Sequence, residues 1–218
     1  MSTTAEARTA ARTAVVDGLE KLRGAFPLEA RVRGASPAAQ ATYGGVLRAW
    51  LGGAAPQAAG FAADALAELL RHDALVEEQG DLGCYPFSAR NTGIAVRLAG
   101  GTVNAMCAID ALAVARLAGA LTRVDGRCET CGTALAVQVE ANGGLDHDQA
   151  EVARVVWFRA CGTHNSCSQS LCRNLRFLCP SCEPASPGDV YTLPQATAIG
   201  NAFFAFQAAF VRGAATGA

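Results

Sequence analysis

Two pairs of cysteines with the same short spacing place the strongest constraint on how this chain can fold. The first is Cys128-x-x-Cys131 and the second is Cys179-x-x-Cys182. One tight turn can direct two sulfurs at the same ion, and two such turns supply the four ligands of a tetrahedral zinc site. The strands between the pairs must then bring together two distant turns. Reduced thiols, or metal on only one pair, are the alternatives.

The remaining cysteines are unevenly distributed. The 218 residues contain nine cysteines, and seven of these lie between residues 128 and 182, whereas Cys84 and Cys107 stand alone. We find no secretory signal ahead of them. In a reducing compartment such crowding indicates metal or thiolate chemistry before disulfides, so we expect a cytoplasmic protein.

A second feature is the apolar stretch NAMCAIDALAVARLAG, residues 104–119, which predicts a buried helix. It contains Cys107 and Asp110, whose spacing of three residues puts both side chains on one helix face. An apolar environment favours the neutral carboxylic acid, so Asp110 could hold a proton near pH 7 beside a soft sulfur ligand. The alternative is structural: Cys107 behaves as a small hydrophobe and Asp110 caps a neighbouring element.

Four more candidate ligands lie between the two cysteine pairs: Cys161, His164, Cys167 and Cys172. They could form a further metal site with sulfur and nitrogen ligands. The serines and asparagines around them instead favour a loop, in which His164 merely caps a turn. Because reactive groups are often carried on loops, both interpretations stay open.

The first hundred residues predict helices followed by short strands. Ser36-Pro37 is typical of a helix start, and this helix should run to about Leu51. A second helix should begin near Pro56, and short strands with turns should follow over residues 75–98. Helix, helix and hairpin in this order are typical of a winged helix.

The charges disfavour the DNA-binding interpretation that a winged helix raises. The candidate recognition helix carries Arg71 against Asp64 and Glu68, a surface that would repel phosphates. The whole chain has a formal net charge of −1, and it contains no apolar run long enough to span a bilayer. We therefore expect neither nucleic acid nor a membrane as a partner.

The second half of the chain predicts strands and one more helix. Residues 121–140 read as two strands on either side of the first cysteine pair, and residues 151–159 as another strand. Residues 193–211 are apolar enough to predict a last helix that is largely buried.

Two segments resemble the organomercurial (alkylmercury) lyase family. Residues 84–119, CYPFSARNTGIAVRLAGGTVNAMCAIDALAVARLAG, contain the Trp/Met-Cys-Ala-hydrophobic-Asp-x-Leu pattern of the family's catalytic helix, with Met at the first position. Residues 169–177, QSLCRNLRF, are similar to its later Gln-Ser-Phe-Cys segment. The winged-helix-like region and the final helix also match in order, so the resemblance covers most of the chain, from about residue 28 to residue 210.

The resemblance implies cleavage of a carbon–mercury bond by protonolysis, giving a hydrocarbon and Hg(II). It assigns Cys107 and Cys172 as thiolate ligands and Asp110 as the proton carrier, although Cys167 could face Cys107 in place of Cys172. It implies a small organometallic substrate, Hg(II) as bound product and no organic cofactor. A thiol or a mercuric reductase would accept the Hg(II).

These inferences combine into one predicted architecture of the α+β class. An N-terminal helix covers residues 1–26, a winged-helix-like module of three helices and a hairpin covers 27–100, and a mixed α/β lyase-like catalytic domain with a zinc knuckle covers 101–218. The additional cysteines leave two alternatives to a lyase. One is a relative with a zinc site, recruited to another metal- or thiol-dependent reaction, and the other is a metal-sensing winged-helix regulator.

Overall fold

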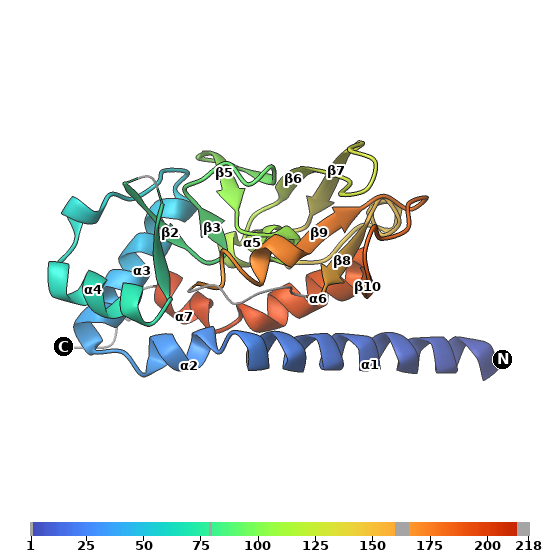
Figure 1. The fold of residues 1–218 in the computed structure, drawn as a ribbon, viewed down its shortest axis with the longest axis horizontal. Helices are drawn as coiled ribbons and strands as arrows, with labels where there is room; N and C mark the ends of the chain where they lie inside the picture. The colour runs from blue at the N-terminus through green and yellow to red at the C-terminus, as the bar shows by residue number, and fades with distance from the viewer. Residues whose placement is uncertain (1, 79, 160–165, 213–218) are drawn as a thin grey trace.

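The computed structural model describes residues 2–78, 80–159 and 166–212, and it shows two antiparallel sheets covered by helices (Figure 1). The larger sheet has the strand order β1-β2-β3-β5-β4-β6-β7, and the smaller has the order β10-β8-β9. The strands of the larger sheet are β1 Leu75–Glu78, β2 Asp81–Cys84, β3 Phe87–Ser88, β4 Ala95–Leu98, β5 Gly101–Ala105, β6 Thr122–Arg127 and β7 Ala134–Val139. Those of the smaller are β8 Arg154–Phe158, β9 Leu175–Leu178 and β10 Gly188–Thr192. The predicted α+β class is confirmed.

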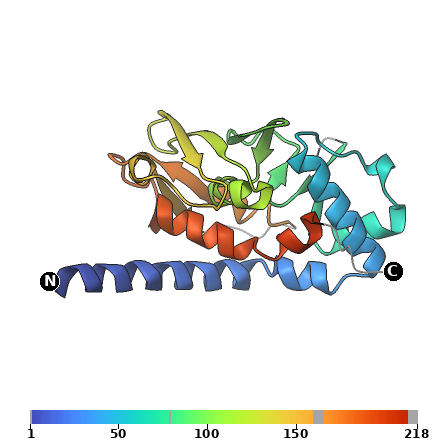
Figure 2. The same ribbon diagram turned by 180° about the vertical axis from the view of Figure 1, so that it is seen from behind.

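Helices from the two ends of the chain lie along one side of the sheets (Figure 1). Helix α6 lies between the long helix α1 and the sheets, as the views from both sides show (Figures 1 and 2). The α-helices are α1 Ser2–Ala25, α2 Leu28–Arg33, α3 Pro37–Leu51, α4 Ala63–Arg71, α5 Ala108–Ala118, α6 Leu193–Phe203 and α7 Gln207–Val211. The described residues also form single 3-10 turns at η1 Ala58–Gly60, η2 His147–Gln149 and η3 Cys172–Asn174.

Helix α3 begins and ends where its sequence predicts. Ser36 is the N-cap, and its Oγ accepts a hydrogen bond from the Ala39 amide at 3.2 Å. The same hydroxyl donates to the Glu68 carboxylate on α4 at 2.6 Å. The cap therefore satisfies a free amide of the first turn and also ties α3 to α4.

Helix α4 begins later than predicted, at Ala63 rather than near Pro56. The residues in between pair with strand β2: the Pro56 carbonyl accepts from the Leu82 amide at 2.9 Å, and Gln57 forms an isolated bridge with Asp81. These contacts hold Pro56 and Gln57 in an extended conformation, so helix α4 begins only after them.

The final apolar segment forms two helices, so the prediction of one helix over residues 193–211 is wrong. The chain turns between Phe203 and Gln207, where Phe204 and Phe206 are both buried. The buried Gln207 amide donates to the Tyr43 hydroxyl and to the Tyr85 carbonyl, each at 2.6 Å. A straight helix could not direct all of these side chains into the same core.

The larger sheet is continuous across the predicted boundary at residue 100. Strands β4 and β5 pair with each other on either side of it, and β3 pairs with β5 through Phe87 and Ala105. The strands predicted to form the hairpin of a winged-helix-like module thus belong to the same sheet as the later strands. The division at residues 26 and 100 stays a prediction. Among the described residues, no helix is both long and apolar enough to cross a membrane.

Candidate active site and four-cysteine cluster

Cys107 and Asp110 lie at the start of helix α5, directly after strand β5. The helix begins at Ala108, because Asn104 and Ala105 belong to β5, so the prediction of a helix from residue 104 is corrected by four residues. Cys107 is the N-cap and has an extended backbone, and its carbonyl accepts the first helical hydrogen bond from Ala111 at 3.0 Å. Both side chains therefore lie in the first turn, where a helix dipole favours negative charge.

Cys172 reaches the same point from the other sheet. It lies in the turn η3, immediately before strand β9, and its Sγ is 3.9 Å from Asp110 Oδ2. The two sulfurs and one carboxylate oxygen of Cys107, Cys172 and Asp110 all lie within 4.8 Å of one another. All three residues are buried, with at most 6% of their surface exposed. The structure thus brings together the three predicted site residues.

Burial controls the ionisation of this group. It raises the pKa of Asp110 to about 7, against hydrogen bonds from Cys107 and Cys172 that lower it. Burial also raises the pKa of the Cys107 thiol. Hydrogen bonds with Cys107 and Cys167, together with burial, raise the pKa of the Cys172 thiol. For Asp110 the desolvation cost therefore outweighs the hydrogen bonds, and at neutral pH the site holds two thiols beside a carboxyl that can take up or release a proton.

Cys107, Asp110 and Cys172 line a very small cavity. Its volume is about 10 Å³, which is about the room that one water molecule needs. Its other walls are Leu22, Phe26, Tyr85, Ile109, Cys167, Leu171, Leu175, Phe203 and Phe204. No local sequence pattern identifies the aromatic walls Phe26, Tyr85, Phe203 and Phe204, because they come from three separate parts of the chain.

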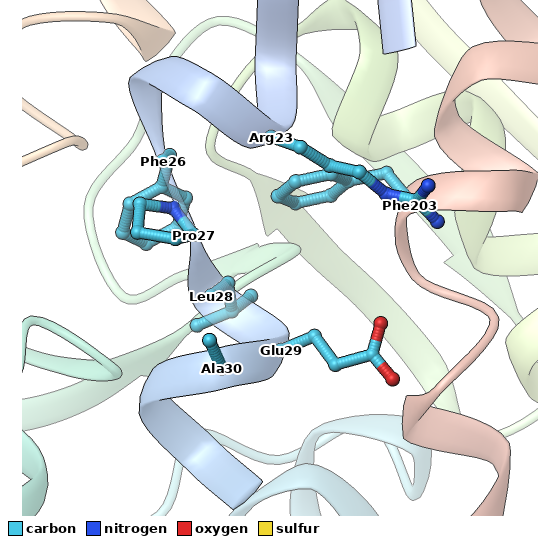
Figure 3. Close-up of a pocket in the computed structure, with 7 residues that line it drawn as sticks. All are labelled: Arg23, Phe26, Pro27, Leu28, Glu29, Ala30 and Phe203. Carbon is cyan, nitrogen blue, oxygen red and sulfur yellow. The ribbon is translucent and has the colours of Figure 1, made fainter. Parts of the chain in front are cut away.

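An open groove lies on the outer side of two of these walls. Phe26 and Phe203 line both the cavity and a groove of about 420 Å³, whose remaining walls come from α1, α2 and the link between them (Figure 3). The centroids of the two rings are 6.3 Å apart. Arg23 and Glu29 extend along the same side of the groove (Figure 3). Two aromatic rings therefore separate the buried thiols from an open, largely apolar surface.

A hydrogen-bond network holds the segment that leads to Cys172. The Cys167 amide donates to Asp73 Oδ2 at 2.8 Å, and the Ser168 amide donates to the Tyr85 hydroxyl at 2.9 Å. That hydroxyl donates in turn to Asp73 Oδ1 at 3.1 Å. Asp73 and Tyr85 are thus positioning residues that sequence reasoning missed. Their contacts with Cys167 and Ser168 each span more than eighty residues of the chain, so no local pattern could have found them.

The predicted loop cluster is only partly described. Cys161 and His164 lie outside the described residues. Cys167 is buried, and its Sγ lies 3.8 Å from Cys172 Sγ. It does not belong to the group of ligand atoms formed by Cys107, Asp110 and Cys172. Cys167 is therefore a neighbour of Cys172 in the cavity wall.

The four cysteines of the two Cys-x-x-Cys pairs form a second cluster. The sulfurs of Cys128, Cys131, Cys179 and Cys182 all lie within 4.8 Å of one another. Cys128 and Cys179 are buried, Cys182 is half-buried and Cys131 is exposed. The cluster therefore lies at the surface, and both groups of thiols have the composition of a metal site.

Comparisons with known proteins bear on the family and the fold of the chain. A family model described as MerB, alkylmercury lyase, matches residues 87–204, which include Cys107, Asp110 and Cys172. A solved structure, titled as the mercury-bound form of MerB2, is similar in fold with a TM-score of 0.58. It is 20% identical in sequence, and the alignment covers 89% of this chain and 99% of that one. No curated protein matches the chain.

Proposed function

We propose that this chain, which belongs to the alkylmercury lyase family, cleaves the carbon–mercury bond of a small organomercurial. The match to the family model confirms the family resemblance that was inferred from the sequence. The observation that carries this proposal is the convergence of Cys107, Cys172 and Asp110 on one buried point. Two soft ligands and one proton carrier are the groups that protonolysis of such a bond requires.

The two thiols would bind mercury in this reaction. Hg(II) is a soft ion, and thiolates are the ligands that soft ions prefer. Donation from the sulfurs of Cys107 and Cys172 increases the electron density on mercury and so weakens its bond to carbon. Both thiols are protonated before substrate binds, because burial and hydrogen bonding raise their pKa values. Each thiol must therefore lose a proton as it binds the metal.

Asp110 would carry one of these protons to carbon. Its pKa of about 7 allows the carboxylate to accept a thiol proton and the acid to donate it, both near neutral pH. For a substrate R–Hg–X, two S–Hg bonds form, while the C–Hg and Hg–X bonds break. One thiol proton passes through Asp110 to give R–H, and the other leaves with X as HX. No electrons are gained or lost, so no oxidant, reductant or organic cofactor is needed.

The substrate must open the site in order to bind. A cavity of about 10 Å³ holds at most one water molecule, whereas even a methyl group bound to mercury is larger. Phe26 and Phe203 lie between the thiols and the groove. We infer that an apolar organic group enters from the groove by displacing these two rings and then excludes water from the thiols.

Product release and metal content complete the proposal. Hg(II) held by two buried thiolates would pass to a thiol in solution or to an acceptor protein such as a mercuric reductase, because only another soft ligand competes for it. The four-cysteine cluster is not part of this reaction centre. The zinc that the sequence predicts there would act on the fold and not on the substrate.

The reaction can be tested with phenylmercuric acetate in the presence of excess thiol, by measuring benzene in the headspace and Hg(II) in solution. The wild-type protein should release one benzene per Hg(II). Cys107→Ser should lose turnover, while Cys84→Ala, which removes a buried thiol outside both clusters, should retain it. Wild-type protein that is folded and yet releases no benzene would contradict the proposal and favour a relative recruited to a different reaction.

A further inference from the structure

The two halves of the four-cysteine cluster come from different sheets. Cys128 and Cys131 lie in the turn that joins β6 to β7 in the larger sheet. Cys179 and Cys182 follow β9, an edge strand of the smaller sheet. Any ion bound by all four would therefore link the two sheets directly.

The spacing of the sulfurs fits one tetrahedral ion. A zinc–sulfur distance of about 2.3 Å in a tetrahedron separates neighbouring sulfurs by about 3.8 Å. Cys131 Sγ and Cys179 Sγ, which come from different pairs, are 3.8 Å apart, and all six pairs of sulfurs lie within 4.8 Å. A disulfide would need about 2.05 Å between two of them. The four sulfurs are thus spaced to bind one shared metal ion and not to form a disulfide.

Backbone and side-chain contacts already hold the two turns together. The Cys179 amide donates to Cys128 Sγ at 3.3 Å, and the Thr130 hydroxyl donates to the Glu183 carbonyl at 3.0 Å. Two guanidinium groups also bind the turns, because Arg127 donates to the Gly132 carbonyl at 3.1 Å and Arg154 donates to the Cys182 carbonyl. Four thiolates and a divalent ion would carry a net charge of −2, beside which these two positive charges lie, and Arg154 is also paired with Glu183 at 3.7 Å.

We propose that Cys128, Cys131, Cys179 and Cys182 bind one zinc ion, which joins the larger sheet to the smaller one. Four thiolates select a soft or borderline ion and disfavour magnesium or calcium. With four protein ligands no position is left for water or substrate, so the ion has a structural role. This assignment does not depend on the proposed lyase reaction.

A zinc ion at this site would also affect the group formed by Cys107, Asp110 and Cys172, because strand β9 connects the two sites. Cys172 lies just before this strand and Cys179 just after it, whereas Cys107 and Asp110 follow β5 of the larger sheet. The zinc ion therefore holds the strand that carries one sulfur of the proposed active site against the sheet that carries the other. Its loss should loosen that geometry without removing a reacting group.

The test is to measure the metals of the full-length protein, purified with a reductant from zinc-supplemented medium. We expect one zinc per chain, with zinc–sulfur distances near 2.3 Å in X-ray absorption. The double variant Cys131→Ser/Cys182→Ser should lose the zinc, and its melting temperature should fall by on the order of 10 °C. Cys84→Ala serves as the matched control, and it should retain one zinc per chain.

Three results would overturn the proposal. Wild-type protein that carries no metal and whose four thiols react freely with a thiol reagent would refute the site. Full zinc in the double variant would show that other residues bind it. Iron in place of zinc would refute the identity of the ion. The wild-type measurement decides the matter even if the double variant fails to fold, and it does so whether or not the protein cleaves organomercurials.

Discussion

Replacing Asp110 by asparagine should stabilise the protein while it removes the proposed reaction. The two side chains have nearly the same shape, but the amide cannot ionise. Burial raises the pKa of Asp110 from 3.8 to about 7, so the folded state binds this proton more tightly than the unfolded chain does. Since the folded state holds more protons between these values, its stability falls as the pH rises through this range.

The size of the effect follows from the same shift. Three pH units at 1.36 kcal/mol each correspond to about 4 kcal/mol lost by the wild type once the pH exceeds 7. About 1.5 kcal/mol of this is already lost at pH 5, because the unfolded carboxyl is ionised there. The stability advantage of Asp110→Asn should therefore grow by about 2.5 kcal/mol between pH 5 and pH 8.

Urea unfolding of both proteins at these two pH values, with reductant and without mercury, measures the difference. Asp148→Asn is the control, since its side chain is 98% exposed and the substitution should not change the pH dependence. In the organomercurial assay, Asp110→Asn should lose about 10²- to 10⁴-fold in rate, the usual contribution of a general acid. Equal pH dependence in Asp110→Asn and the wild type would refute the buried ionisation, and full turnover in the variant would refute the proton carrier.

Two further pairs of substitutions test the site and its support. Cys172→Ser should lower Hg(II) release by more than about 100-fold, whereas Cys167→Ser, which alters a neighbour of the ligand, should cost about 10- to 100-fold. The reverse order in the same assay would exchange their roles. Gly200→Ala should destabilise the protein by about 1–2 kcal/mol, because the added Cβ would lie 2.7 Å from the Ile109 carbonyl and that clash exceeds the gain in helix propensity. Gly24→Ala in α1 meets nothing within 4 Å and should be neutral or slightly stabilising in urea unfolding; a similar loss in both would remove the packing argument.

The features that the sequence by itself determined are those that depend on neighbouring residues. Ser36 and Pro37 start helix α3 because a hydroxyl and a fixed backbone angle act within one turn. The two Cys-x-x-Cys pairs likewise predict two-sulfur turns, since each pair needs only its own loop. The apolar surroundings of Asp110 predicted a raised pKa, and burial in the folded chain has that effect.

Only the tertiary structure decided which distant groups meet. Cys172 is 62 residues from Asp110 in the chain, and its approach depends on how the two sheets pack. Phe26 and Phe203 close the cavity from opposite ends of the sequence, and the last apolar segment breaks into two helices to fill the same core. Periodicity reports which face of a segment is apolar but not what covers it, so these contacts follow from packing over the whole chain.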